Sequence, residues 1–392
     1  MPTRRVLHVN DRSLESLGGA EVLMARTCGL LNDAGWQVRT FTEADLPDRR
    51  LTARRYLSNP VSHSALAQVL TELRPDVVHL HNYYHLLSPA ILPLLATYKH
   101  EAGARVVMTA HDYHLVCPNS GGNWFRGGPR LVDVDRLNSW RYLLTRRWDH
   151  RGVHYSMLKL LQHIVNYRLL DRRRAIDLVL CTCRFLQELV TRIGLPARHL
   201  ANPGPAVVVK QCVRPAELTL VFAGRIEPEK GIKRFLEALP ADFGGRLRIV
   251  GEGADRSACE SICTSKGIAS RVEFLGRQTH AQTIEAIASA HVVVVPSLLF
   301  ETYPLVAQEA LTVGTNILVA DYGGMKEMVL DAGVGFRFHP FHPETLRVQL
   351  RDIESAHGAG TLNSFDVTKF LAGRTDADYL AGLLRAYAGE PA

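Results

Sequence analysis

Short runs of β-branched and other apolar residues alternate with longer amphipathic stretches along almost the whole chain, and this alternation restricts the fold more than any other feature. A run such as VVVV at 292–295 is too apolar for a strand with one face in water, so it predicts a strand covered on both faces. Strand, helix and strand at this spacing are typical of right-handed crossovers in a parallel sheet. The sequence therefore predicts an α/β protein with doubly wound parallel sheets.

The alternating pattern runs along the chain twice. A chain of 392 residues is also too long for one ordinary hydrophobic core. We therefore predict two Rossmann-like domains, over 1–205 and 206–375, joined by a connection that includes 202–209. A last helix within 376–392 is predicted to pack across the domains. The expected strands are 5–9, 36–42, 76–81, 104–111, 177–182, 218–224, 247–251, 272–276, 292–296 and 316–320. The expected helices lie within 18–35 after a loop, at 86–99, at 185–193, from 231, at 255–266, at 281–290, after 304 and at 377–387.

The segment 120–175 differs in composition from the rest of the chain. Between Arg126 and Arg174 there are twelve Lys or Arg and four acids, a balance of 12 − 4 = +8, so the remainder of the chain carries 7 − 8 = −1. The segment also holds three of the four tryptophans and the amphipathic stretch 154–174, in which apolar positions such as Met157 and Leu161 oppose polar ones such as Gln162 and His163. This pattern indicates either an insertion with its own function, such as contact with an anionic partner, or a helix packed on the sheet edge.

Several protein classes are disfavoured by composition. No stretch approaches the roughly 20 apolar residues of a membrane span, and the start of the sequence lacks the apolar region of a signal peptide. The seven cysteines form no C-x-x-C motif or zinc-ligand spacing, which favours reduced, buried thiols. We therefore expect a cytoplasmic protein.

Glycines and basic residues at expected strand ends are candidates for phosphate binding. Gly18 and Gly19 open a helix after the first strand, where backbone N–H groups could approach a phosphate, although an ordinary turn explains them equally well. Arg225 and Lys230 follow a strand in the second half, and two cations in one loop suit a diphosphate. Salt bridges to neighbouring glutamates are the alternative for this pair.

Two glutamates follow the VVVV strand at a spacing of eight residues. Glu301 lies in the expected loop and Glu309 lies two turns into the expected helix, whose first turn accommodates Pro304. Glu309 could accept both hydroxyls of a ribose, and Glu301 could bind sugar hydroxyls. A single glutamate is more often a solvated charge on a helix face, so each residue alone is weak evidence.

The ordered set of motifs resembles the retaining GT-B glycosyltransferases of family 4, also called glycosyltransferase group 1. The resemblance rests on AGRIEPEKGI (223–232), LRIVGEGAD (247–255), VEFLGR (272–277), the pattern PS-x₃-E-x₇-E-A-L-x₂-G from residue 296, and GGMKEMV (323–329). In the first half, DVVHLHN (76–82) and TAHDYHLVCPN (109–119) are similar to the acceptor domain of that family. The resemblance covers about 1–119 and 177–330, and it implies two Rossmann-like domains facing an interdomain cleft.

The resemblance also implies roles for individual residues. His111, Arg225, Lys230 and Glu301 would be catalytic: His111 beside the reacting face of the donor sugar, Arg225 and Lys230 on the leaving diphosphate, and Glu301 on the transferred sugar. Glu309 would bind the ribose diol. The other donor-binding residues would be Gly18, Gly19, Gly276, Arg277, Thr302, Tyr303, Pro304 and Leu305. Where E-G-F-G is frequent in the family, this chain has Glu301-Thr302-Tyr303-Pro304, and because Pro304 has no N–H, the detailed phosphate contacts must differ.

The function implied by the resemblance is transfer of a hexosyl group, with retention, from a nucleotide sugar to an acceptor. The basic segment 120–175 fits docking on an anionic membrane, which favours a saccharide or lipid-linked saccharide acceptor in cell-surface polysaccharide synthesis. A UDP-sugar is favoured over a GDP-sugar as donor, with no cofactor and no essential metal. The D-x-D sequences at 133–135 and 376–378 do not follow buried strands, so we expect neither to bind a metal. We do not expect nucleic acid as a partner. We do expect peripheral contact with an anionic membrane through residues 126–174.

Several alternative functions remain at this point. One is transfer to a small-molecule natural product, with 120–175 as a lid. A second is a catalytically inactive GT-B protein that binds a sugar nucleotide. A sugar epimerase or a phosphorylase on the same architecture is a third, although the phosphorylase would need a pyridoxal-binding lysine that we cannot place.

Overall fold

The computed structural model describes residues 4–15, 18–205 and 212–390, and it divides the chain into two compact units. Unit 1 comprises 1–126, 132–202 and 376–392, and unit 2 comprises 127–131 and 203–375. The expected connection 202–209 lies partly outside the described residues. Among the residues described, no helix is both long and apolar enough to span a bilayer.

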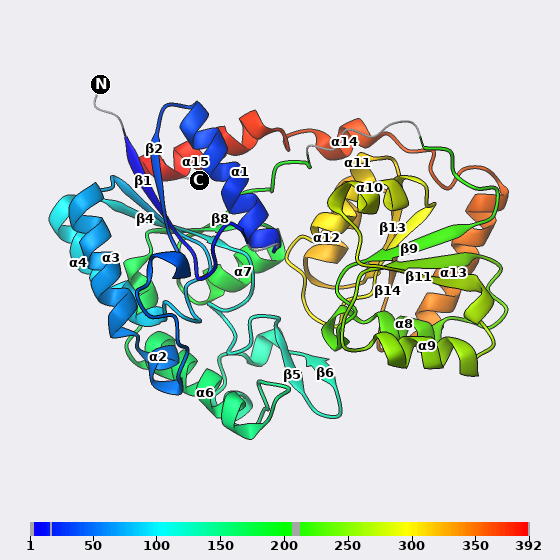
Figure 1. The fold of residues 1–392 in the computed structure, drawn as a ribbon, viewed down its shortest axis with the longest axis horizontal. Coiled ribbons are helices and arrows are strands. Elements are labelled where there is room, and N and C mark those ends of the chain that lie inside the picture. The colour runs from blue at the N-terminus through cyan, green and yellow to red at the C-terminus, as the bar shows by residue number, and fades with distance from the viewer. Residues whose placement is uncertain (1–3, 16–17, 206–211, 391–392) are drawn as a thin grey trace. The chain divides into compact units, whose positions relative to one another are not determined.

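Unit 1 contains a parallel sheet of six strands in the order β2-β1-β3-β4-β7-β8 (Figure 1). Its strands are as apolar as predicted: every residue of β3 and β7 is buried. The strand order reverses at β1, because β2 pairs with one edge of β1 and β3 pairs with the other. The strands are β1 (Arg5–Val9), β2 (Gln37–Phe41), β3 (Val77–Leu80), β4 (Arg105–Ala110), β7 (Leu178–Cys181) and β8 (Ala197–His199).

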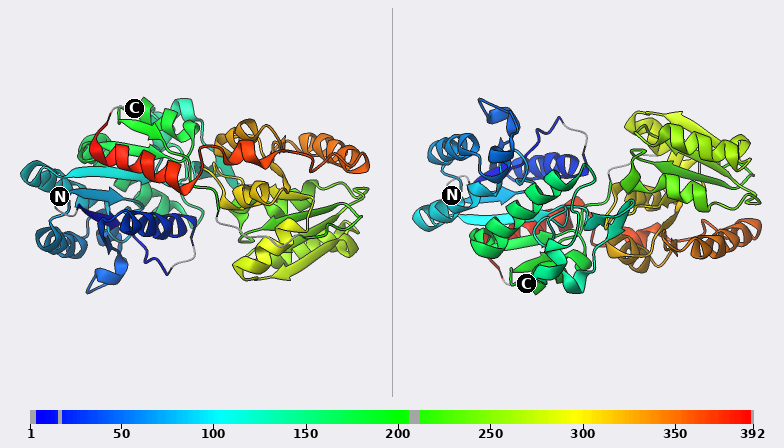
Figure 2. Two further views of the ribbon diagram at one scale, coloured as in Figure 1. Left: turned by 90° about the horizontal axis from the view of Figure 1, so that it is seen from above. Right: turned by 90° about the horizontal axis from the view of Figure 1, so that it is seen from below.

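Helices cover the sheet of unit 1, and the last helix of the chain is one of them. Helix α15 (Asp376–Ala388) lies beside α1 (Gly19–Asp33), as Figure 2 shows, and both contribute to one hydrophobic cluster with the sheet. Tyr379 on α15 hydrogen-bonds the hydroxyl of Thr27 on α1 at 2.9 Å. The other helices and helical turns are η1 (Glu43–Asp45), α2 (Ala53–Leu57), α3 (Pro60–Leu73), η2 (Pro89–Ile91), α4 (Leu92–Ala102) and α7 (Arg184–Arg192).

The helix expected at 86–99 begins later in the structure, at Pro89 as a 3₁₀ turn and at Leu92 as an α-helix. The reason is local hydrogen bonding. The carboxylate of Asp11 accepts hydrogen bonds from the backbone N–H groups of His85 and Leu87, at 2.7 and 2.8 Å, and holds this stretch out of a helix. Ser88 then adopts a positive φ of 63° and its hydroxyl caps the 3₁₀ turn.

The basic segment folds around a small two-stranded sheet and a helix whose orientation is the reverse of an ordinary amphipathic helix. In this helix, α6, the polar Gln162 and His163 are fully buried, whereas the side chains of Met157 and Leu161 are 63% and 47% exposed. The apolar positions Met157 and Leu161 are therefore not the buried face of α6. The elements are β5 (Asn123–Phe125), β6 (Pro129–Leu131), η3 (Val134–Arg136), α5 (Trp140–Leu144), α6 (Val153–His163), the π-helix η4 (Ile164–Leu169) and η5 (Arg172–Ala175).

Unit 2 contains a second parallel sheet of six strands, in the order β11-β10-β9-β12-β13-β14. Counted along the unit, this is the order 3-2-1-4-5-6 of dinucleotide-binding Rossmann sheets, with its switch point between β9 and β12. The two predicted Rossmann-like sheets are thus confirmed. The strands are β9 (Thr219–Ala223), β10 (Arg246–Val250), β11 (Val272–Gly276), β12 (Val292–Val295), β13 (Asn316–Ala320) and β14 (Phe336–Phe338).

The helices of unit 2 follow its strands in alternation. They are η6 (Pro228–Lys230), α8 (Ile232–Ala238), α9 (Arg256–Ser265), η7 (Ala269–Arg271), α10 (His280–Ala288), α11 (Leu305–Thr312), α12 (Gly323–Ala332), α13 (Pro343–Gly358) and α14 (Val367–Leu371). The expectations omitted β8, β14, α3, α12 and α13. The strands β8 and β14 have only three residues each, which is too short a pattern to be recognised.

Candidate functional site

The loops after β9 and β12 meet at the switch point of the sheet of unit 2, which is where ligands bind in folds of this kind. Lys230, at the end of η6, places its Nζ 2.7 Å from Oε1 of Glu301. The hydroxyl of Ser297 donates to the same carboxylate oxygen, also at 2.7 Å. The side chains of Lys230 and Glu301 are 29% and 16% exposed, so the ion pair is largely shielded from water.

Glu301 is held as a carboxylate by this arrangement. Burial alone raises its pKa, but the charge and hydrogen bond of Lys230, the hydroxyl of Ser297 and the charge of Arg225 together bring the pKa below its usual range. Arg225 itself is 68% exposed and lies 3.5 Å from Glu229, so it takes part in the field at Glu301 without a direct bond to it. The cluster therefore offers one shielded cation and one exposed cation beside an ionised carboxylate.

Close backbone packing fixes the loops that carry these residues. Gly231 has a φ of +75°, and a Cβ there would lie 1.9 Å from the carbonyl oxygen of Pro296. Likewise a Cβ on Gly324 would lie 1.6 Å from the carbonyl oxygen of Thr302, and the N–H of Gly324 donates to the carbonyl of Glu301 at 3.1 Å. Because Gly231 and Gly324 have no Cβ, their backbones can approach the carbonyls of Pro296 and Thr302. This close packing positions the loops that carry Lys230 and Glu301.

The turn from Glu301 to α11 leads directly into a helix N-terminus. Pro304 occupies the N-cap position, and Leu305 is the first residue of the helix. Tyr303 is 4% exposed, and the guanidinium of Arg374 lies over its ring at 4.9 Å. The unsatisfied N–H groups of the first turn and the positive end of the helix dipole favour an anion at this end of α11.

Glu309 lies further along α11, with its side chain 13% exposed. Its Oε1 is 2.8 Å from Nε2 of His280 at the start of α10, whose side chain is 71% exposed. Gly276 ends β11 with a φ of +67°, and its carbonyl accepts a hydrogen bond from the N–H of Gly251 at 2.8 Å. Arg277, which follows it, is exposed.

In unit 1, the predicted residues lie at the carboxyl ends of β1 and β4. Gly18 is the N-cap of α1 and Gly19 its first residue. A Cβ on Gly18 would lie 2.0 Å from a carboxylate oxygen of Glu21, which is itself buried and accepts from Nδ2 of Asn10. This carboxylate places negative charge at the helix N-terminus, which suits a hydroxyl better than a phosphate there.

His111 follows β4 directly and belongs to a cluster of buried histidines that the sequence analysis did not identify. Its Nε2 is 2.9 Å from Nδ1 of His81, and Nε2 of His81 is 2.9 Å from Nδ1 of His8. Burial lowers the pKa of His111 to about 4 and that of His8 to about 3, so both rings are neutral near pH 7. The signal that could have revealed the cluster is the presence of histidines inside otherwise apolar strands.

Three further residues of the site in unit 2 were also absent from the sequence analysis: Ser297, His280 and Tyr322. Ser297 and Tyr322 are joined by a hydrogen bond from the Tyr322 hydroxyl to the carbonyl of Ser297. Such contacts join residues far apart in the sequence and leave no local pattern. The two D-x-D sequences lie elsewhere, with Asp135 paired to Arg192 and Asp376 paired to Arg26.

The family model described as "Glycosyl transferases group 1" matches residues 210–359, and the one described as "Glycosyltransferase Family 4" matches residues 17–202. A glycogen synthase of Mycobacterium tuberculosis is 29% identical over 259 residues, which is 63% of this chain and 59% of that protein. For the first curated relatives that match, the alignment spans between 29% and 59% of their own length.

Solved structures match over nearly the whole chain. The sucrose-phosphate synthase from Thermosynechococcus elongatus has a TM-score of 0.72 at 18% identity and covers 98% of both chains. HepE of Anabaena in complex with UDP-glucose has a TM-score of 0.64 at 16% identity and covers 98% of this chain and 99% of that one. At these identities the structural likeness shows the fold.

Proposed function

Because the chain belongs to the glycosyltransferases of group 1 and family 4 and has the GT-B fold, we propose that it transfers a hexosyl group from a nucleotide sugar to an acceptor hydroxyl with retention of configuration. The observation that carries the proposal is the shielded Lys230–Glu301 pair at the switch point of unit 2, beside the N-terminus of α11. A cation, helix amides and a carboxylate within one loop cluster match a sugar diphosphate, which presents anionic oxygens on one side and hydroxyls on the other.

In the proposed reaction, the bond from the anomeric carbon of the donor sugar to the diphosphate oxygen breaks, and a bond from the acceptor oxygen forms on the same face. The acceptor proton passes to the departing phosphate oxygen. Lys230, Arg225 and the first-turn amides of α11 would stabilise the charge that develops on the diphosphate. Glu301 would accept hydrogen bonds from sugar hydroxyls. His111 would donate to the reacting groups from unit 1, with no divalent cation required.

The nucleoside part of the donor is proposed to bind at Glu309. This carboxylate is nearly buried and already accepts from one ring N–H or imidazolium at His280, so it has the remaining lone pairs to accept both hydroxyls of a ribose. The segment of Gly276 and Arg277 would meet the base. We favour UDP, the nucleotide bound by the HepE structure.

Calorimetric titration with UDP, GDP and ADP, with and without EDTA, tests this proposal. We expect micromolar binding of UDP that EDTA does not change. Glu309→Ala should weaken it roughly 10- to 100-fold, since a hydrogen bond to a charged group contributes about 1.5–3 kcal/mol. Glu285→Ala removes an exposed glutamate of the neighbouring helix α10 and should bind UDP as the wild type does. Absence of binding by all three nucleotides, or equal binding by Glu309→Ala, would contradict the donor site.

We further propose that the acceptor is a saccharide carried on a lipid, as in cell-surface polysaccharide synthesis, and that α6 brings the protein to an anionic membrane surface. Val153, Met157 and Leu161 lie four residues apart along α6, so they form one stripe on the helix. All three are exposed, as is Leu169 of the following π-helix. A row of exposed apolar side chains along one helix face indicates a surface that binds a partner.

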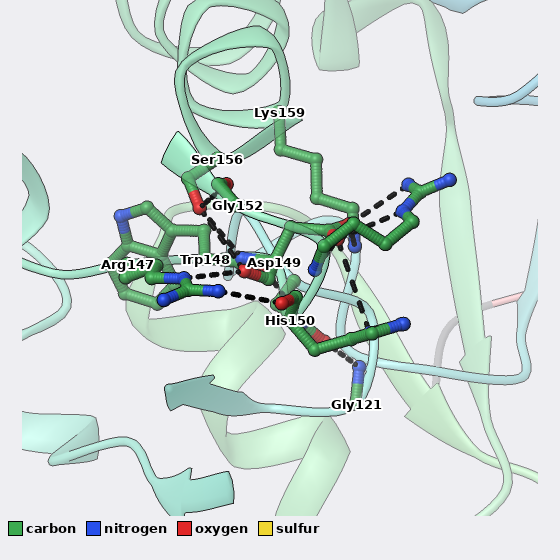
Figure 3. Close-up of polar contacts among 10 residues, drawn as sticks. Gly121, Arg147, Trp148, Asp149, His150, Gly152, Ser156 and Lys159 are labelled. Atoms are coloured by element: carbon green, nitrogen blue, oxygen red, sulfur yellow. Dashed lines mark hydrogen bonds and ion pairs between the residues drawn. The ribbon is translucent and has the colours of Figure 1, made fainter. Parts of the chain in front are cut away.

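The polar contacts beneath α6 keep this stripe outward. Figure 3 shows Lys159 reaching from the helix to Asp149, whose side chain is 2% exposed and lies 3.0 Å from the Lys159 Nζ. The Ser156 hydroxyl accepts from the backbone N–H of Asp149 at 2.9 Å. Nε2 of the buried Gln162 donates to the carbonyls of Tyr56 and Tyr84, which holds this side chain on the inner face of α6.

The charge around the stripe selects the partner. Apart from Arg173, which is buried, residues 149–174 contain five Lys or Arg and two Asp, a balance of 5 − 2 = +3. Two copies of such a face would repel each other, and a nucleic acid would not cover the apolar stripe. An anionic lipid surface satisfies both the charge and the apolar side chains.

Co-sedimentation with vesicles of phosphatidylcholine, alone or with 30 mol% phosphatidylglycerol, tests the membrane contact. We expect binding to the anionic vesicles only, reduced at least tenfold by the double variant Met157→Glu/Leu161→Glu. The matched control is Leu330→Glu/Val348→Glu, which introduces the same two charges at residues of unit 2 that are 62% and 55% exposed. Equal binding to both vesicle types, or equal binding by the double variant and the control, would exclude this surface.

A further inference from the structure

A column of stacked histidine rings runs across the carboxyl ends of β1, β3 and β4 in unit 1. Neighbouring ring centroids are 4.8 Å apart for His8 and His79, 4.5 Å for His79 and His81, and 5.2 Å for His81 and His111. The parallel register of the sheet places His8 directly beside His79, and the next residue of the same face in that strand is His81. The column therefore lies at the switch point of unit 1, where a ligand of this unit would bind.

The nitrogens of the column are joined in a single chain of hydrogen bonds. Nδ1 of His8 faces Nε2 of His81 at 2.9 Å, and Nδ1 of His81 faces Nε2 of His111 at 2.9 Å. Because a neutral imidazole carries one N–H, each contact needs one donor and one acceptor, and the chain can point in only two directions. Either all three rings carry the hydrogen on Nδ1, or all three carry it on Nε2.

The end of the hydrogen-bond chain at His8 favours one of these directions. Within the residues that the structure describes, Nε2 of His8 is buried and has no hydrogen-bond partner. If the hydrogens are on Nε2, this end is a buried N–H without an acceptor. If they are on Nδ1, it is only an unused lone pair. Buried donors without partners are rarer in proteins than incompletely used acceptors, so the second direction is favoured.

His79 takes no part in the chain of hydrogen bonds from His8 to His111, because both of its nitrogens have other partners. Its Nδ1 lies 2.7 Å from the hydroxyl of Tyr387 on α15, and its Nε2 lies 2.8 Å from the hydroxyl of Thr109. Both nitrogens are thus occupied, although His8, His79 and His81 lie close enough together to suggest a metal site. With its plane fixed from two sides, the His79 ring holds the stacked ring of His81 in place.

We propose that His8 and His81 are positioning residues that hold His111 in the tautomer with its hydrogen on Nδ1, so that His111 meets the substrate as a neutral hydrogen-bond donor. This inference rests on the proposed function, because it assumes that His111 contacts the reacting groups. Burial keeps the rings of the column neutral, as the lowered pKa values of His8, His79, His81 and His111 indicate. A neutral ring donates a hydrogen bond without giving up a proton at neutral pH.

The tautomers can be read directly by long-range ¹H–¹⁵N correlation spectra of protein labelled with ¹⁵N-histidine. The His111→Gln variant identifies the signals of His111. We expect an Nδ1–H tautomer for His111 in the wild type, unchanged between pH 6 and pH 8. His81→Asn places an amide donor near the position of Nδ1 and should keep this tautomer. His81→Leu removes the donor, so His111 should become a mixture of tautomers.

Turnover gives the second measurement. We expect kcat to fall at least tenfold in His81→Leu and less than threefold in His81→Asn, with KM for the donor within twofold in both. Tryptophan fluorescence, which reports unit 1, and circular dichroism show whether each variant is folded. An Nε2–H tautomer of His111 in the wild type, or stoichiometric zinc on the purified protein coordinated by His8 and His81, would overturn the proposal whatever the enzyme does. Unchanged kcat in His81→Leu would overturn the positioning role. If the tautomers are as expected but no sugar is transferred, the proposed function is wrong, whereas the tautomer assigned to His111 is still confirmed.

Discussion

Lys230→Ala is expected to lower kcat by about 10²- to 10³-fold while UDP binding weakens far less. The reason is that a preorganised group facing charge that develops in the transition state contributes about 3–4 kcal/mol. Lys230 is suited to this role because its Nζ is already fixed at 2.7 Å from Glu301 and only partly exposed, so little reorganisation is needed when the diphosphate departs. Steady-state kinetics with the donor identified by calorimetry provide the measurement.

A double-mutant cycle separates the effect on the diphosphate from the effect on Glu301. Without Lys230, burial would raise the pKa of Glu301, and part of the loss in Lys230→Ala would then come from a changed carboxyl group. Glu301→Gln and the double variant measure that part. Lys369→Ala, which removes an exposed lysine of α14, is the matched control and should keep full activity. Normal specific activity of folded Lys230→Ala would contradict the role.

The strands and the order of the motifs could be predicted from the sequence because both are local properties. Strands such as VVVV at 292–295 are buried on both faces, so their composition alone identifies them. Placing Lys230 and Glu301 at strand ends then followed from the general rule for α/β sheets, and the structure brings the two into contact. The roles assigned to these residues stay predictions until the variants are measured.

Helix α6 shows what the sequence could not predict. Its amphipathic pattern is real, but pattern alone does not say which face is buried. Burial of Gln162 depends on two backbone carbonyls, of Tyr56 and Tyr84, that lie 106 and 78 residues away in the sequence. The histidine column is missed for the same reason, since each ring by itself resembles an isolated polar residue in an apolar strand.

A second large effect is expected on acidification: unit 1 should lose about 5 kcal/mol of stability between pH 7 and pH 5.5. His8, His79, His81, His114 and His163 are buried, and burial lowers the pKa of each one well below its ordinary value near 6.5. The unfolded chain therefore binds protons over this range and the folded chain does not, so stability falls as the pH falls. Each histidine contributes about 1 kcal/mol over this interval. His111, whose pKa burial lowers to about 4, adds about 1 kcal/mol to the loss, and Asp112, whose pKa burial raises to about 6, offsets it by less than about 1 kcal/mol.

The tryptophans allow this loss to be assigned to one unit. Trp36, Trp124, Trp140 and Trp148 all belong to unit 1, so urea unfolding followed by their fluorescence reports that unit alone, while circular dichroism reports both. Because a loss of about 5 kcal/mol is comparable with the whole stability of many domains, the fluorescence midpoint should move sharply to lower urea between pH 7 and pH 5.5. His163→Phe removes one buried histidine outside the column and should reduce this pH dependence by about one fifth. A fluorescence midpoint that stays constant over the interval would mean that these rings are protonated in the folded state at pH 5.5. That result would also contradict the proposal that the rings beside His111 are neutral.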